Sequence, residues 1–329
     1  MFNIEPIFSV APMMNWTDRH CRVFHRLLSR KALLYSEMKT TGAIIHGNRK
    51  KLLNFSEIEH PLSLQIGGSN PKELTEASRI GVDFGYDEIN LNVGCPSDRV
   101  QSGCFGATLM KEPKLVVECI SQMKKAVENT RVTVKCRLGV DDQDPNILLP
   151  RFIDYLVNAG VDGIIIHARK AILSGLSPKQ NRDIPPLDHG LVSRMKKKFP
   201  QTEIVINGGI DNLTQAKQFI DSGLDGVMVG RAAYHHPNDI LLFADSVIFE
   251  ESARNTSMKN VLFDFCRYIE MELGKGTRLH EMTRHILGAF NGYPGARFYR
   301  QTLSEHAYKD GAGTEVLRNA IDQIFEDKI

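Results

Sequence analysis

The sequence predicts a (β/α)₈ barrel followed by a smaller helical region. Eight short apolar runs recur through the first three quarters of the 329 residues, and stretches with helical periodicity lie between them. Near-continuous apolar runs are typical of parallel strands that are buried on both faces. Eight such strands alternating with helices over about 240 residues are the pattern of a (β/α)₈ barrel.

The expected strands, in chain order, cover residues 8–13, 33–38, 61–68, 88–95, 132–139, 163–169, 203–210 and 226–232. Helical periodicity is clear over residues 113–127, 150–160 and 214–223; the first two stretches open near a proline and the third ends at a glycine. A doubly wound sheet is the alternative architecture, but its glycine-rich phosphate turn usually follows the first strand. Here the first strand ends in Ala-Pro-Met-Met, and the paired glycines follow the seventh strand.

The sequence pattern changes at about residue 250, where the alternation of strands and helices ends. Amphipathic helices are expected over residues 261–273, 280–290 and 313–325, with glycines and a proline marking breaks between them. We therefore expect a barrel domain at residues 1–249 and a helical domain at residues 250–329.

Composition excludes several classes of protein. The six cysteines form no C-x-x-C pair and no Cys/His cluster with zinc spacing, so neither a metal site nor a secreted disulfide framework is expected. The start of the chain lacks the pattern of a signal peptide, and no apolar run reaches the about 18 residues of a membrane span. We expect a cytoplasmic monomer with no membrane partner and no obligate protein partner.

The net charge of +2 means that a polyanion would have to bind to local basic patches of the surface.

The carboxyl ends of the expected strands carry chemically useful residues. In a (β/α)₈ barrel these ends meet at one face and build the active site. Amides, a thiol, an ammonium group, an imidazole and paired glycines at so many strand ends are hard to explain as barrel packing. In order, the strand ends are Met13 and Met14, Glu37, Gln65, Asn92 and Cys95, Lys135, His167, Asn207 to Gly209, and Gly230 with Arg231.

Cys95 lies in a Gly-Cys-Pro turn at the end of its strand, three residues after Asn92. A thiol that a turn holds at a strand end is accessible to a substrate. A lone cysteine is more often a small buried hydrophobic residue. The chemistry at the other strand ends favours the functional interpretation.

The last two strand ends predict a phosphate site. The loops after strands seven and eight are the usual phosphate-binding loops of this fold. Gly208 and Gly209 let backbone N–H groups approach an anion, the helix expected to start near Leu213 adds a favourable dipole, and Arg231 adds positive charge.

Three side chains at strand ends predict that a ligand with a polar ring system binds at the barrel mouth. They are Lys135, His167 and Gln65. A lysine between apolar strand residues rarely stays buried without a partner, and here it can stabilise a reduced, anionic flavin. His167 can donate to a ring carbonyl or a phosphate, and Gln65 can both donate and accept. A snorkelling lysine and a core histidine are the structural alternatives. No GxGxxG follows a strand, so a Rossmann dinucleotide domain has no support.

Six motifs closely resemble those of the flavin-dependent tRNA-dihydrouridine synthases: APMMNWTDRHCR, LNVGCPS, VKCRLG, IIHARK, NGGI and VMVGRAA. Residues 170–188, together with Trp16 to His20, resemble the A-type bacterial branch. The resemblance implies a barrel with FMN at its mouth, a C-terminal helical domain that binds tRNA, NADPH as the reductant, and uridines 20 and 20a of the tRNA D-loop as targets.

The resemblance also implies roles for individual residues. Cys95 would be the proton donor, and Asn92 would lie against the target base. The flavin ring would be flanked by Pro12, Met13 and Met14 and contacted by Gln65, Lys135 and His167. Its phosphate would be held by Asn207, Gly208, Gly209, Gly230 and Arg231. The tRNA would contact Lys179, Arg182, Arg297 and Arg300.

The implied chemistry agrees with the residues. Reduction of the 5,6 double bond of uracil needs a hydride, which reduced FMN can supply, and a proton, which a neutral thiol can supply. The uridine would have to flip out of the tRNA to reach the pocket. Residues 168–182 and 277–300 carry more basic than acidic side chains, which predicts two phosphate-binding stretches, although such runs are often merely solvated.

Two alternative functions remain open at this point. One is an FMN barrel that reduces a free pyrimidine, which the basic stretches and the helical tail disfavour. The other is an RNA-binding factor with a vestigial flavin site, which the intact set of Cys95, Lys135 and His167 disfavours.

Overall fold

The computed structural model describes residue 4, residues 7–253 and residues 255–326. Within this part, nine parallel strands form one sheet in the order β1-β9-β8-β7-β6-β5-β4-β2, and β3 pairs with β4. The strands are β1 (Phe8–Val10), β2 (Leu34–Tyr35), β3 (Lys39–Thr40), β4 (Leu62–Gly67), β5 (Glu88–Val93), β6 (Arg131–Arg137), β7 (Gly163–His167), β8 (Ile204–Asn207) and β9 (Gly226–Val229). The eight expected strands are all present, and the short β3 is an addition.

The sheet closes on itself between its first and second strands. The N–H of Val10 donates to the carbonyl of Leu33, and the N–H of Leu33 donates to the carbonyl of Phe8, both at 3.0 Å. These bonds bring β1 beside the segment that enters β2. The closed ring makes the carboxyl ends of all the strands converge at one mouth.

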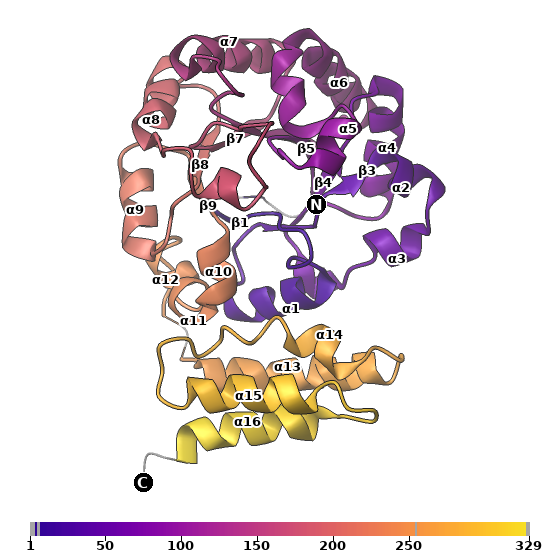
Figure 1. Ribbon diagram of the computed structural model, residues 1–329, viewed down its shortest axis with the longest axis vertical. Coiled ribbons are helices and arrows are strands. Elements are labelled where there is room, and N and C mark those ends of the chain that lie inside the picture. The colour runs from indigo at the N-terminus through magenta and orange to yellow at the C-terminus, as the bar shows by residue number, and fades with distance from the viewer. Residues whose placement is uncertain (1–3, 5–6, 254, 327–329) are drawn as a thin grey trace.

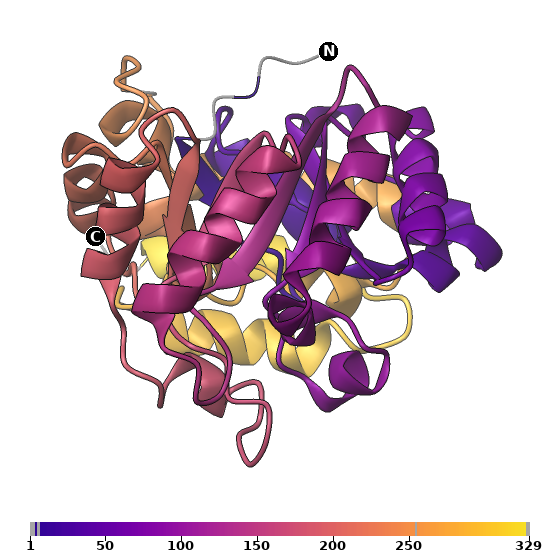
Figure 2. The same cartoon turned by 90° about the horizontal axis from the view of Figure 1, so that it is seen from above.

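Helices surround the ring of strands, as Figures 1 and 2 show. In chain order they are α1 (Arg19–Leu28), α2 (Thr41–His46), α3 (Arg49–Leu53), α4 (Pro71–Asp83), α5 (Asp98–Ser102), α6 (Pro113–Ala126), α7 (Pro145–Asn158), α8 (His189–Lys198), α9 (Leu213–Asp221), α10 (Arg231–His235), α11 (Pro237–Ile240) and α12 (Ala244–Val247). Short 3₁₀ turns are η1 (Glu57–Glu59), η2 (Gly106–Lys111) and η3 (Gln180–Arg182). Several of the outer helices start at a proline in the first turn, where its missing N–H costs nothing.

One expected helix boundary in the barrel is wrong. The helix expected from residue 150 begins at Pro145, and Pro150 lies inside it. Asp144 precedes the helix, and its side chain accepts a hydrogen bond from the N–H of Asn146. An aspartate cap followed by proline is a stronger start signal than an internal proline.

The interior of the barrel is polar at its amino-terminal end and partly apolar at mid-height. Glu88 accepts hydrogen bonds from the hydroxyls of Tyr35 at 2.7 Å and Ser63 at 2.9 Å. Arg131 forms ion pairs with both Glu88 and Glu203. These polar contacts occupy the amino-terminal end of the barrel. A small apolar cluster lies above them, formed by Ala11, Leu33, Tyr35, Ile165, Val205 and Met228.

The last helices form a layer beside the barrel, next to α1 and α11, as Figure 1 shows. They are α13 (Met258–Leu273), α14 (Leu279–Thr283), α15 (Ala296–His306) and α16 (Thr314–Glu326). The expected helix at 280–290 is wrong beyond Thr283, and α15 was not expected. Gly295, with φ of 81°, directly precedes α15, whose buried Ala296, Tyr299 and Leu303 follow a helical spacing.

Asp18 connects the barrel mouth to this layer. Its side chain accepts hydrogen bonds from the N–H groups of His20 and Cys21 at the start of α1. The same carboxylate pairs with Arg284 and with the buried side chain of His285, which follow α14. Although burial opposes ionisation, the hydrogen bond and charge of His285 hold the pKa of Asp18 well below its usual range. The helical layer is thereby docked on α1 through a charged, hydrogen-bonded contact.

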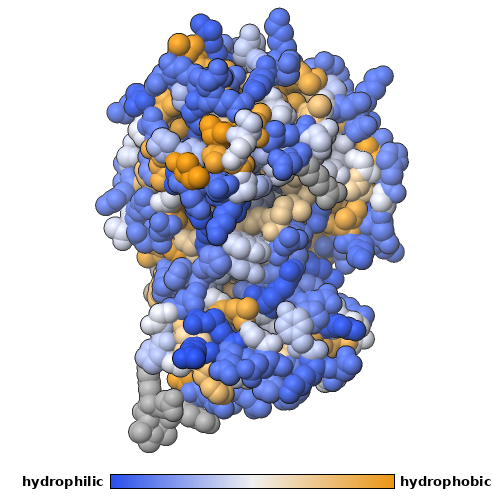
Figure 3. All heavy atoms as spheres, in the orientation of Figure 1, coloured by the Kyte–Doolittle hydropathy of each residue, from blue (hydrophilic) through white to orange (hydrophobic). Residues whose placement is uncertain are grey.

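Figure 3 shows a largely hydrophilic face that is hollowed near the centre of the barrel. Among the residues that the structure describes, no helix combines the length and the apolar character required to span a membrane.

Candidate functional site

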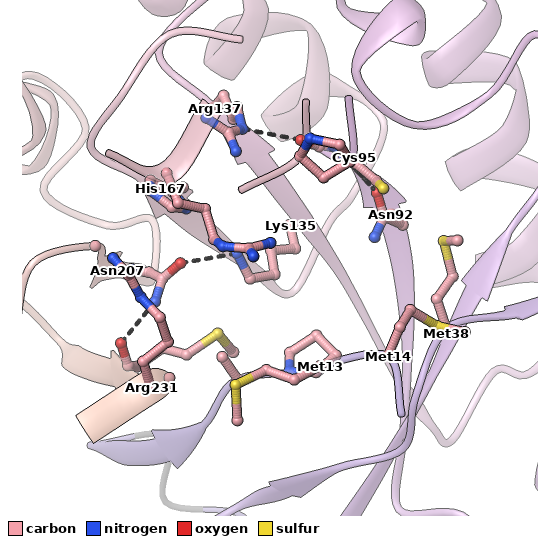
Figure 4. Close-up of a pocket in the computed structure, with 18 of the residues that line it drawn as sticks. Met13, Met14, Met38, Asn92, Cys95, Lys135, Arg137, His167, Asn207 and Arg231 are labelled. Carbon is pink, nitrogen blue, oxygen red and sulfur yellow. Dashed lines mark hydrogen bonds between the residues drawn. The ribbon is translucent and has the colours of Figure 1, made fainter. Parts of the chain in front are cut away.

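A cavity of about 490 Å³ opens at the carboxyl ends of the strands. It brings together most of the residues that the sequence analysis selected: Pro12, Met13, Met14, Gln65, Asn92, Cys95, Lys135, His167, Arg182, Asn207, Gly208, Gly209, Gly230 and Arg231. Figure 4 shows Met13 and Met14 on one side of this group and Cys95 on the other, with Lys135 between them. Lys179, Arg297 and Arg300 do not line the cavity, and neither does Glu37.

The sequence analysis missed several of the residues that line the cavity. Trp16, Met38 and Arg137 also face the cavity. Arg137 was detectable, because the two-residue period of a strand places it on the same face of β6 as Lys135. Trp16 is the single tryptophan of the chain, and it stacks on Tyr234 with ring centroids 4.5 Å apart. No periodic signal in the sequence marks that contact.

The turn that carries Cys95 is held by Asn92. The side-chain oxygen of Asn92 accepts hydrogen bonds from the N–H groups of Gly94 at 3.1 Å and Cys95 at 2.9 Å. Its amide nitrogen donates to the side-chain oxygen of Gln65, which is 2.8 Å away. Asn92 is therefore engaged at both ends of its amide, and it fixes the direction of the turn. The Cys95 sulfur faces the cavity with the Ser97 hydroxyl 3.5 Å away.

Lys135 places a partly buried cation in the wall of the cavity. Its ammonium donates to the side-chain oxygen of Asn207 at 2.9 Å, and the amide of Asn207 donates to the carbonyl of Met228 at 2.8 Å. Burial, and to a smaller extent the nearby positive charge of Arg137, lower the pKa of Lys135 from 10.5 to about 8. The ammonium can thus interact with an electron-rich ring or give up its proton near neutral pH.

His167, at the end of β7, carries a buried nitrogen that needs a partner. Its Nε2 atom has no hydrogen-bond partner among the described residues. Burial first, and then the charges of Arg137 and Lys135, hold the pKa of His167 well below its usual 6.5, so the imidazole is neutral at physiological pH. Buried polar groups without a partner are uncommon in folded proteins. We therefore expect a ligand in the cavity to form a hydrogen bond with this nitrogen.

Gly208 and Gly209 form a narrow backbone cradle after β8. Both have positive φ, 104° and 69°, a conformation that favours glycine. A Cβ on Gly208 would come within 2.9 Å of the His167 ring, and one on Gly209 would collide with Leu187. The nine-residue helix α9 then begins at Leu213. Bare backbone close to a helix start is suited to binding a phosphate.

Arg231 has an acidic partner that the sequence analysis did not expect. Its guanidinium lies 2.9 Å from the carboxylate of Asp183, and both side chains are about half exposed. Asp183 follows η3 in the segment of residues 170–188, which we call the basic segment. The same segment carries Arg182 on the cavity wall and the exposed Lys179. Arg231 and the basic segment are therefore in direct contact.

The other two predicted arginines lie on α15, in the helical layer. Arg297 is exposed, and Arg300 donates to the side-chain oxygen of Asn291 at 2.6 Å. The neighbouring Tyr293 and Phe298 are each 46% exposed. These groups give the helical layer a basic and aromatic surface apart from the cavity.

Comparison with known proteins agrees with this geometry. The sequence model of the family described as dihydrouridine synthase (Dus) matches residues 9–326. A relative from Shewanella oneidensis is 51% identical over 327 residues, covering 99% of this chain and 96% of its own. A relative from Vibrio cholerae is 53% identical over 317 residues, covering 96% of both chains. A relative from Escherichia coli K12 is 52% identical over 322 residues, covering 98% of this chain and 92% of its own. All three are named tRNA-dihydrouridine(20/20a) synthase.

Solved structures confirm the predicted barrel. The old yellow enzyme homologue from Zymomonas mobilis has a TM-score of 0.56 at 11% identity and covers 77% of this chain and 91% of its own. Morphinone reductase has a TM-score of 0.52 at 10% identity, covering 76% of this chain and 87% of its own. At these identities the likeness shows the fold alone.

Proposed function

The chain belongs to the dihydrouridine synthase family, and from this premise we propose that it reduces uridine to 5,6-dihydrouridine in tRNA. The observation that carries the proposal is the convergence of Cys95, Lys135 and His167 on one cavity. The names of relatives with about half of their residues identical support uridines 20 and 20a as the targets. We further propose a cytoplasmic monomer in which residues 1–249 form the catalytic domain and residues 250–329 bind tRNA.

We propose FMN as the cofactor, because the cavity fits it. The unpartnered Nε2 of His167 and the bare backbone at Gly208 and Gly209 are the features that a polar ring and a phosphate would satisfy. The phosphate would be held by Asn207, Gly208, Gly209, Gly230 and Arg231, and the ring by Pro12, Met13, Met14, Gln65, Lys135 and His167. When bound and reduced by NADPH, FMN supplies a hydride for carbon 6 of the uracil ring.

Cys95 supplies the proton in this proposal. Its thiol would donate to carbon 5 of the base, and the sulfur would regain a proton from solvent, which balances the addition of a hydride and a proton across the double bond. Asn92 holds the turn, so that the sulfur faces the cavity. Lys135 would place positive charge beside the ring that carries the negative charge of the reduced state.

Four basic residues would bind the tRNA backbone. Lys179 and Arg182 lie on the basic segment, and Arg297 and Arg300 lie on α15. Contacts with phosphates position a nucleic acid without reading its bases, so the two sites together would set the orientation of the tRNA over the cavity. The target uridine would leave its stack and enter the cavity.

The test separates the two half-reactions of the holoenzyme. We expect Cys95→Ala to bind one FMN per chain and to be reduced by NADPH at the wild-type rate, but to form dihydrouridine about 10²–10⁴-fold more slowly, the range for loss of a general acid. Cys104→Ala removes an exposed thiol from the neighbouring segment and is the matched control. A colourless protein that does not bind added FMN would refute the flavin site. Turnover of free uracil without RNA would favour the alternative of a free-pyrimidine reductase.

A further inference from the structure

The backbone around Cys95 is bonded to the basic segment through two side chains. Arg137 donates from Nε to the carbonyl of Gly94 at 3.0 Å. Gln101 donates from Nε2 to the carbonyl of Pro96 at 2.9 Å. The two residues that flank Cys95 therefore each have their carbonyl held by a side chain, and Figure 4 shows the bond from Arg137 beside the cysteine.

Both side chains also hold the basic segment. Arg137 donates from Nη1 to the carbonyls of Lys170 and Asn181, each at 2.9 Å. The same Nε2 of Gln101 donates to the carbonyl of Leu173 at 2.8 Å. Each of these side chains thus bridges the Cys95 turn and the segment that carries Lys179 and Arg182.

The basic segment is itself a well-bonded unit. Asn181 is fully buried, and its amide nitrogen donates to the carbonyls of Ile172 and Leu176. Asn181 directly precedes Arg182 and lies two residues after Lys179, so the backbone that carries these two cations is joined to Arg137. A displacement of the basic segment would therefore shift the carbonyls of Gly94 and Pro96, which flank the Cys95 thiol.

Arg137 is a buried cation bonded to carbonyls. Its side chain is only 3% exposed, and burial lowers its pKa to about 10. A guanidinium has several N–H donors in a fixed planar arrangement, so a single residue can connect separate backbone segments. Lysine would retain the charge but has no such planar fork.

We propose that Gln101 and Arg137 are positioning residues that align the Cys95 thiol with the target base by joining its turn to the segment that binds tRNA. The proposal rests on the proposed function and adds a physical connection between tRNA binding and proton donation. A general acid must lie within hydrogen-bond reach of its acceptor. A misplacement of about 1 Å can cost about 10²-fold in rate.

The test uses the FMN-loaded enzyme and the Gln101→Met variant. Methionine keeps the length of the side chain and removes the N–H donor. Gln122→Met is the matched control, because Gln122 lies on α6 and its amide donates to the exposed Glu118 instead. Three quantities are measured for each protein: flavin reduction by NADPH, flavin reoxidation by saturating tRNA without oxygen, and the dissociation constant of tRNA.

We expect Gln101→Met to slow reoxidation by about 10-fold or more at saturating tRNA, as for a misaligned reactive group. Reduction by NADPH, FMN content and tRNA affinity should stay near wild type, and Gln122→Met should behave as wild type throughout. Arg137→Lys should slow reoxidation as well, despite its retained charge. Reoxidation at the wild-type rate would overturn the proposal. A defect that disappears as tRNA is raised would also overturn it, because the residue would then only anchor the segment.

A second readout needs no turnover. In holoenzyme without tRNA, the rates of alkylation of Cys95 and Cys104 are measured together, since Arg99 separates them into different tryptic peptides. Loss of the Gln101 bonds should raise the alkylation rate of Cys95 several-fold relative to Cys104. An unchanged ratio would contradict the link. If wild-type enzyme failed to modify tRNA, the proposed function would fall, while this ratio would still report whether Gln101 holds the turn.

A double-mutant cycle tests the connection itself. Lys179→Met should lower the maximal reoxidation rate in the wild-type background and should have a smaller effect in the Gln101→Met background, because coupled residues are not additive. Equal effects in both backgrounds would show that binding at Lys179 and alignment of Cys95 are independent.

Discussion

The ammonium of Lys135 and the side-chain oxygen of Asn207 lie 2.9 Å apart inside the barrel mouth. The two residues belong to β6 and β8, so the bond spans the intervening β7. A partly buried amine whose hydrogen-bond partner is neutral is protonated less readily than one in water, in agreement with the lowered pKa of about 8 for Lys135.

This lowered pKa makes the stability of the FMN-free protein depend on pH. The folded protein releases the Lys135 proton at about pH 8 and the unfolded chain at about 10.5, so the wild type should gain stability as pH rises through this window. Lys135→Met has no such proton, and the difference between the two free energies of unfolding should change by up to about 3 kcal/mol. Urea unfolding of both proteins at pH 7.5 and pH 10 measures it; parallel pH profiles would contradict the lowered pKa of Lys135.

His167→Phe should have opposite effects on stability and on cofactor binding. Removing the unpartnered Nε2 should stabilise the FMN-free protein by about 1–3 kcal/mol, the cost of a buried polar group without a partner. FMN affinity should fall, because the group proposed to contact the cofactor is absent. Thermal unfolding measures the first effect, and quenching of Trp16, the single tryptophan, measures the second. Lower stability with unchanged affinity would assign His167 to the core.

Asn92 offers a test of the cysteine turn by two substitutions. Asn92→Asp keeps an oxygen for the N–H groups of Gly94 and Cys95, whereas Asn92→Ala removes it. Both lose the donor to Gln65. We expect the alanine variant to reoxidise with tRNA more slowly than the aspartate variant, with both still reduced by NADPH. Single-turnover stopped-flow measurements compare them; the reverse order would contradict the proposed role of the Asn92 side-chain oxygen in holding the cysteine turn.

Arg297→Ala combined with Arg300→Ala should weaken tRNA binding in a salt-dependent way. The slope of log affinity against log salt should fall by about 0.7–0.9 for each phosphate that the variant no longer neutralises. Arg151→Ala with Arg267→Ala removes the same charge from exposed positions on α7 and α13 and is the control. Filter binding at several salt concentrations measures both pairs. An unchanged slope in the α15 variant would show that the helical layer is not a phosphate-binding surface.

The barrel could be predicted because its strands lie in apolar runs that alternate with helical stretches, and because a parallel barrel forces their carboxyl ends together. That geometry brings Cys95, Lys135 and His167 into one cavity although they are far apart in the sequence. The helix α15 was missed because Gly292 and Gly295 were interpreted only as a break. Glycine at positive φ also starts a helix here.

Contacts between loops were beyond sequence reasoning. The pair of Arg231 with Asp183 and the bond from Gln101 to Leu173 join residues that share no periodic pattern. Their partners depend on how the basic segment folds back over the mouth. Arg137, in contrast, could have been found from the alternation of β6.

Asp18 contacts both the start of α1 and the helical layer, so the layer cannot be exchanged independently of the barrel. Met13 faces the cavity, and five residues later Asp18 caps α1 and pairs with Arg284 and His285. A chimera that receives a foreign helical layer would leave this carboxylate without its partners and would disturb a helix start close to the catalytic mouth. With the tRNA-binding role proposed for the layer, redirecting the enzyme to another position in the RNA would require exchanging the β1–α1 loop together with the layer.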